Sequence, residues 1–96
     1  MGAYAFEQEA EGQTPAIAFR RAIEKARYDH GNAGYTGTVA EKSEFTLLKL
    51  PEGEEPLAYA RKLMEADDPR VCDKWGPAGS LPLGKNRWLF FGWASS

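Results

Sequence analysis

The sequence has few of the residues on which disulfides, metal sites and membrane spans depend. Cys72 is the only cysteine among 96 residues, so an internal disulfide is excluded and a reducing, cytoplasmic compartment is expected. His30 is the only histidine, and no spacing typical of metal ligands surrounds it. No apolar run approaches the roughly 20 residues that cross a bilayer, and residues 1–6 lack the features of a signal peptide. The chain is therefore expected to use no metal, no cofactor and no membrane.

An excess of charge of either sign is also missing. Lys and Arg together number 12 against 14 Asp and Glu, and the basic residues do not cluster. Neutralising the backbone of a long nucleic acid requires clustered cations, so such a partner is not expected. The 43% hydrophobic content suits one soluble domain over residues 1–96, with a modest core.

Hydrophobic periodicity predicts two helices. Thr14 and Pro15 are favourable residues for the start of a helix, and apolar residues at helical spacing follow until Gly31, a natural helix end. A second helix is expected over about 56–67, beginning at Pro56 and ending before Pro69.

Four strands are expected, over residues 3–9, 35–40, 44–50 and 87–93. The second and third are interpreted as a hairpin, although 32–43 could instead form one long loop. Residues 70–86 contain many Gly and Pro residues and are predicted to be irregular. The resulting order is βαββαβ, which predicts an α+β fold of the ferredoxin-like type, with two helices on one face of an antiparallel sheet.

The last expected strand carries bulky apolar residues on both of its sides, which indicates a strand that is buried on both faces. In a ferredoxin-like sheet this strand usually lies at an edge and one sheet face is bare. Phe91 and Trp93 are therefore predicted to need a cover, which could be the 70–86 loop, a second copy of the chain in a homodimer or another partner.

A glycine-rich run follows the first helix, and its candidate ligand-binding residues are Gly34, Tyr35, Thr36, Gly37 and Thr38. Glycines let several backbone N–H groups turn toward one anion, threonine hydroxyls add donors, and Lys42 would add charge. The run does not match a known phosphate-binding loop motif. The other interpretation is a helix end followed by a strand that glycine bends.

The 70–86 region offers a second set of candidates for the same ligand. Trp75 could stack on a nucleotide base, and Lys85 could meet a phosphate. Alternatively, Trp75 only fills the core.

A nucleophilic pair of His30 and Cys72 is the one arrangement that would favour an enzyme. No spacing supports the pair, because each residue is the only one of its kind in the sequence. Each also has an ordinary role, His30 at a helix end and Cys72 as a small buried residue. No catalytic residues are therefore predicted.

The segment from Gly34 to Lys42 and the ending from Trp88 to Ser95 resemble small uncharacterised proteins of actinobacterial phages and mobile elements. The resemblance transfers no activity and no functional residues. It implies an accessory protein that binds a host component, either a defence protein or a signalling nucleotide, in the cytoplasm of the host cell.

These observations predict a non-enzymatic binding protein that sequesters a small phosphate-bearing or nucleotide ligand between residues 31–42 and 74–87. The alternative is a protein–protein inhibitor of a host defence protein, acting through the apolar sheet face or the C-terminal strand.

Overall fold

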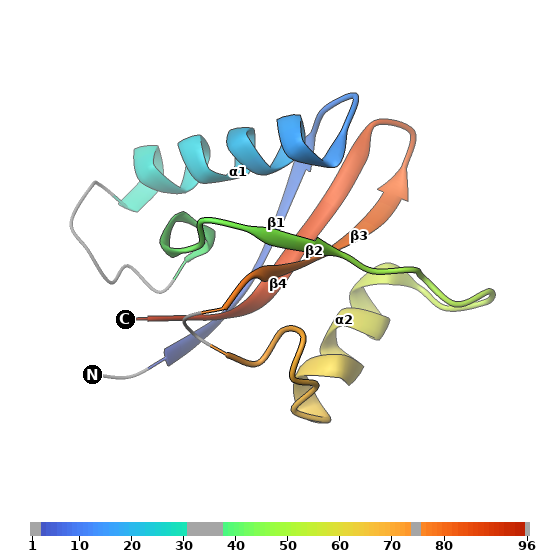
Figure 1. Ribbon diagram of the computed structural model, residues 1–96. Helices are drawn as coiled ribbons and strands as arrows, with labels where there is room; N and C mark the ends of the chain where they lie inside the picture. Colours follow the sequence, from blue (N-terminus) through green and yellow to red (C-terminus); the bar gives the residue numbers. More distant parts are fainter. Residues whose placement is uncertain (1–2, 31–37, 74–75, 96) are drawn as a thin grey trace.

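The structure is a computed structural model, and it describes residues 3–30, 38–73 and 76–95 (Figure 1). Its sheet has four strands, which are β1 (Ala3–Glu11), β2 (Phe45–Leu47), β3 (Ala78–Gly84) and β4 (Arg87–Ser95). The helices are α1 (Pro15–His30), the short 3₁₀ helix η1 (Val39–Glu41) and α2 (Pro56–Glu65). The α+β class predicted from the sequence is confirmed.

The ferredoxin-like order is wrong. The strands lie in the order β1-β4-β3-β2, and β2 pairs parallel with β3 while the other pairs are antiparallel. The sheet is therefore mixed, and α2 serves as the crossover between the parallel strands. The last strand, β4, lies inside the sheet between β1 and β3, whereas an edge position was expected.

Three elements differ from the prediction: the expected strand 35–40, the expected strand 44–50, of which only Phe45–Leu47 is a strand, and the expected irregular stretch 70–86. The described part of the expected strand 35–40 contains the start of η1, and residues 35–37 lie outside the described residues. The only β-hairpin among the described strands joins β3 to β4, and the described residues of 35–40 form no hairpin with 44–50. Residues 78–84, which were expected to be irregular, form a strand.

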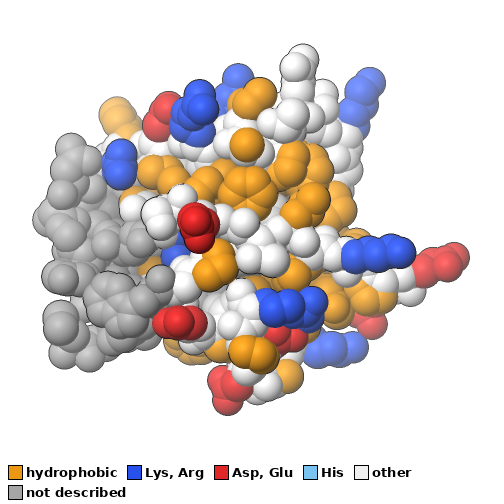
Figure 2. Space-filling view, in the orientation of Figure 1, with side chains coloured by type: hydrophobic (Ala, Val, Ile, Leu, Met, Phe, Trp, Pro, Cys, Tyr) orange, Lys and Arg blue, Asp and Glu red, His pale blue; other side chains and the backbone are white. Residues whose placement is uncertain are grey.

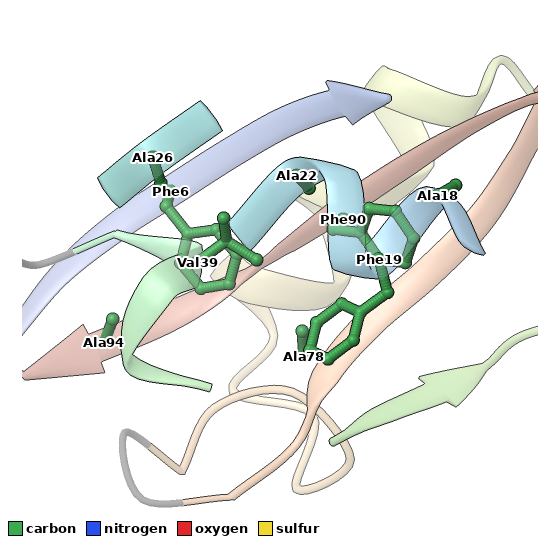
Figure 3. Close-up of a cluster of buried hydrophobic side chains, with 9 residues drawn as sticks. All are labelled: Phe6, Ala18, Phe19, Ala22, Ala26, Val39, Ala78, Phe90 and Ala94. Carbon is green, nitrogen blue, oxygen red and sulfur yellow. The ribbon is translucent and has the colours of Figure 1, made fainter. Parts of the chain in front are cut away.

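The two helices cover opposite faces of the sheet (Figure 1). One core cluster lies beneath α1 and is built on Phe6, Phe19, Val39 and Phe90 (Figure 3). The expectation of two helices on one face, with the second face bare, is wrong. The double-sided apolar strand is buried within a single chain, because each of its faces meets a different helix.

The second core cluster lies on the α2 side, where Leu81, Leu89 and Phe91 pack against α2. Phe91 is fully buried in it. Gly79 makes this packing possible, since a Cβ there would lie 2.6 Å from the Phe91 ring and 2.7 Å from Val71 Cγ1. None of the described helices is both long and apolar enough to cross a membrane.

Candidate functional site

A groove runs between α1 and the β2 edge of the sheet. Its volume is about 570 Å³, and its lining comes from α1, the end of η1 and the start of β2: Ala16, Phe19, Arg20, Ile23, Glu24, Arg27, Ala40, Lys42, Ser43 and Phe45. A second hollow of about 460 Å³ continues it along β2 and shares Phe19, Ser43 and Phe45. The two hollows therefore adjoin at these three residues beside the sheet edge.

Aromatic rings form the apolar floor of this groove. The rings of Phe19 and Phe45 have centroids 5.0 Å apart, and each also contacts the ring of Phe90, at 5.3 and 5.8 Å respectively. Phe90 is fully buried, which fixes the other two rings from below. Phe45 is only partly buried, so its ring offers a surface to a ligand.

Charged side chains of α1 form the upper wall. Arg20 and Arg27 are exposed and lie seven residues apart, so they project from the same side of the helix, with the exposed Glu24 between them. Figure 2 views this side of the molecule, and it shows hydrophobic side chains gathered below the Lys and Arg side chains of α1. The groove therefore combines an apolar floor with a cationic rim.

Lys42 belongs to the groove wall, but its ammonium group is directed into the protein. Its Nζ donates hydrogen bonds to the carbonyl oxygens of Asp73 and Gly76, at 3.0 and 2.9 Å, and the residue is only 4% exposed. Burial lowers the pKa of this amine, while the nearby Asp73 carboxylate partly opposes that effect by raising it. The side chain ties the end of η1 to the turn that precedes β3.

The remaining predicted ligand residues do not form one group in the described structure. Thr38 caps η1, where its hydroxyl accepts a hydrogen bond from Ala40 N at 3.2 Å. Lys85 lies in the turn between β3 and β4. It follows the far end of β3, roughly 20 Å along that strand from the Lys42 contact. Gly34, Tyr35, Thr36, Gly37 and Trp75 lie outside the described residues.

Among the described residues, the two loops predicted to frame the ligand, 31–42 and 74–87, meet where Lys42 donates to Gly76 O in the second loop and to Asp73 O just before it. Most of the rest of the second loop is β3, which leads away from this contact. Phe91 is a core residue, and Trp93 is partly buried on the α2 side. Neither side chain belongs to an exposed face of the single chain.

The structure does not bring Cys72 close to the helix that ends at His30. Cys72 packs with the α2-side cluster, whereas α1 covers the other face. Its thiol contacts the carbonyl oxygens of Leu63 and Met64 at 4.0 and 3.8 Å. Burial is the main cause that raises the pKa of this thiol, so it stays protonated and is a poor nucleophile at neutral pH. Within the described ranges, no three His, Cys, Asp or Glu side chains are placed to hold a metal ion.

Sequence reasoning missed the groove residues Phe19, Arg20, Arg27 and Phe45. Phe19 is one of the apolar residues at helical spacing, which predict a buried helix face, and no motif marks either arginine as a ligand residue. The spacing of Arg20, Ile23 and Arg27 was the available signal, because residues three, four and seven apart share one side of a helix. Only the tertiary structure places Phe45 opposite this side of the helix.

No family model matches the chain, and no curated protein or solved structure matches it either. The resemblance to small phage proteins therefore remains a prediction.

Proposed function

We propose that the protein is a non-enzymatic binding protein, and that the groove between α1 and β2 takes a small ligand which combines a flat ring with phosphate. The observation that carries the proposal is the meeting of two exposed arginines with a partly exposed aromatic floor in one depression. A planar ring packs favourably on Phe45, while guanidinium groups recognise phosphate oxygens through paired hydrogen bonds.

The arginines, and not Lys42, supply the charge in this proposal. The Lys42 ammonium already donates to two carbonyl oxygens. If it turned toward a ligand, both oxygens would lose this hydrogen-bond donor. Arg20 and Arg27 are exposed on the groove side of α1, so they can turn toward a phosphate at little cost. Glu24 between them disfavours ligands that carry negative charge along their whole length.

Isothermal titration calorimetry with AMP and ATP tests the proposal. We expect both nucleotides to bind. Adenosine and pyrophosphate should bind at least tenfold more weakly, because adenosine lacks the phosphate and pyrophosphate lacks the ring. The Arg20→Gln and Arg27→Gln variants should each weaken nucleotide binding about fivefold, the equivalent of roughly 1 kcal/mol.

The matched control is Arg61→Gln on α2, because this exposed arginine lies on the opposite face of the sheet, where it pairs with Glu7. Its nucleotide binding should equal that of the unmodified protein. The absence of binding heat across a panel of mono- and cyclic nucleotides would refute the proposal.

The second candidate is a protein–protein inhibitor of a host protein. Its predicted surfaces, a bare sheet face or an exposed last strand, coincide with the α1-side and α2-side cores. An inhibitor would therefore have to act through a sheet edge or a helix surface.

A further inference from the structure

We infer that two copies of this chain associate through their β2 edges, with the two β2 strands antiparallel and Thr46 on the twofold axis. The inference does not rest on the proposed ligand, and its tests contain none. It follows from four features of the β2 edge: the direction of its backbone groups, its exposed apolar side chains, the register that these impose, and the contrast with the opposite edge.

The backbone of β2 directs alternate residues away from the sheet. Ala78 N donates to Glu44 O at 3.0 Å, and Leu48 N donates to Ser80 O at 2.9 Å. In a parallel pair, these two bonds mean that the backbone groups of Glu44, Thr46 and Leu48 face β3. The N–H and C=O groups of Phe45 and Leu47, which lie between them, therefore point away from the sheet. β2 is the last strand on its side of the sheet, and a strand of another chain can pair with those groups.

Apolar side chains accompany the outward backbone groups. Leu47 is 55% exposed, and Phe45 is partly exposed on the same, α1-facing side of the strand. β2 itself, Phe45–Leu47, contains no charged residue, and the exposed Glu44 and Lys49 lie beyond its two ends, so no charged side chain stands within the strand to prevent pairing. Figure 2 looks onto this edge and shows a band of hydrophobic side chains between α1 and β2.

The strand is complementary to itself in one register. When Thr46 lies opposite the partner's Thr46, Phe45 lies opposite the partner's Leu47, and Leu47 lies opposite the partner's Phe45. Each of these two pairs can exchange two backbone hydrogen bonds, since all four residues direct their groups outward. The same register covers each exposed Leu47 with a phenyl ring, and a threonine pair at the centre is favourable.

The opposite edge shows how the chain prevents such pairing elsewhere. Every second residue of β1 from position 7 onward is a glutamate, so Glu7, Glu9 and Glu11 lie on one face of the strand. Two antiparallel β1 strands would therefore bring glutamates of both copies together. Arg61 and Arg87 also bind Glu7 and Glu9 there. Charged side chains therefore disfavour pairing through β1, whereas β2 is the edge that accepts a second copy.

Pairing through β2 also changes the groove. Phe45 lines both hollows of the groove, and the partner's Leu47 would lie beside it. The second copy would then form part of the wall on the open side of the groove. Because each strand is short, the contact is small and the dimer should be weak, with dissociation at about 10 µM to 1 mM.

Disulfide trapping tests the register. In a Cys72→Ser background, Thr46→Cys should form a covalent dimer under mild oxidation, because opposed residues that exchange no hydrogen bonds have Cα atoms about 4.5 Å apart, within the range for a disulfide. Tyr4→Cys in the same background is the control, because Tyr4 is 64% exposed and lies on β1, the edge at which charged side chains disfavour pairing. We expect Thr46→Cys to cross-link at least tenfold faster, and equal rates would overturn the inference.

Sedimentation velocity of the unmodified protein from 10 µM to 1 mM gives an independent test. The protein should shift toward a dimer with concentration. Leu47→Lys should remain a monomer, whereas Tyr4→Lys should behave as the unmodified protein, and circular dichroism should show all three folded. A protein that stays monomeric at 1 mM, or a Leu47→Lys variant that dimerises normally, would overturn the inference.

Discussion

At the scale of single residues, Lys42 shows how a charged side chain can be given the wrong partner. It follows a glycine-rich run, which favours a cation that meets a ligand. Its ammonium instead donates to the carbonyl oxygens of Asp73 and Gly76, which are 31 and 34 residues away in the sequence. Only the tertiary structure brings these acceptors to the lysine.

Lys42→Met should lower the free energy of unfolding by about 1–3 kcal/mol, because two partly buried carbonyl oxygens lose their charged donor. Urea unfolding followed by tryptophan fluorescence measures the change. Lys85→Met, at an exposed turn position, should change stability by less than about 0.5 kcal/mol. Equal effects of the two substitutions would argue against a structural role for Lys42.

At the scale of elements, β3 was mistaken for a loop because Gly79, Pro82 and Gly84 are residues that usually interrupt strands. Each has a place in the sheet. Gly79 leaves room for the Phe91 ring, and Pro82 and Gly84 flank an irregularity in the pairing with β4, where proline is tolerated. Glycine and proline do disfavour a strand locally, but the hydrogen bonds and the packing with neighbouring strands outweigh this preference.

The turn after α2 depends on one carboxylate. Asp68 accepts hydrogen bonds from the guanidinium of Arg70 at 2.8 Å and from the backbone N–H of the same residue at 2.9 Å. These bonds lower the pKa of Asp68 from 3.8 to about 2. A carboxyl whose pKa is lower in the folded state stabilises the fold above its unfolded pKa, and this contribution is lost as the pH falls toward the folded value.

Asp68→Asn should therefore lower the urea midpoint at pH 6, and its difference from the unmodified protein should shrink between pH 4 and pH 2. Comparing the two proteins at each pH cancels the effect of the other carboxyl groups. Glu65→Gln, an exposed neighbour on α2, serves as the control and should follow the unmodified protein. A difference that stays constant down to pH 2 would exclude the carboxylate as its cause.

At the scale of the whole molecule, the main result is that one chain covers both faces of its own central strand. Phe90 meets α1, and Phe91 meets the α2-side cluster. The double-sided apolar pattern of residues 87–93 correctly predicted a strand buried on both sides. The expected cover from a second copy is unnecessary for Phe91, since α2 and its neighbours already provide it.

Phe91→Ala should cost about 3–5 kcal/mol of stability, because it leaves a cavity in the α2-side core. An interface residue would instead alter the assembly while the monomer stayed intact. Urea unfolding and sedimentation velocity together separate the two cases. Phe91→Leu provides a milder second variant, should Phe91→Ala fail to fold. Full stability of both variants would contradict the core position.

The sequence by itself determined the α+β class, the positions of α1 and α2, and the double burial of the last strand. These depend on local periodicity and on residues that start or end helices, so neighbouring positions contain the information. Tertiary structure alone decided the strand order, the opposite placement of the helices, the groove between α1 and β2, and the partners of Lys42. Each of these depends on contacts between distant segments, whose hydrogen bonds and packing no local pattern specifies.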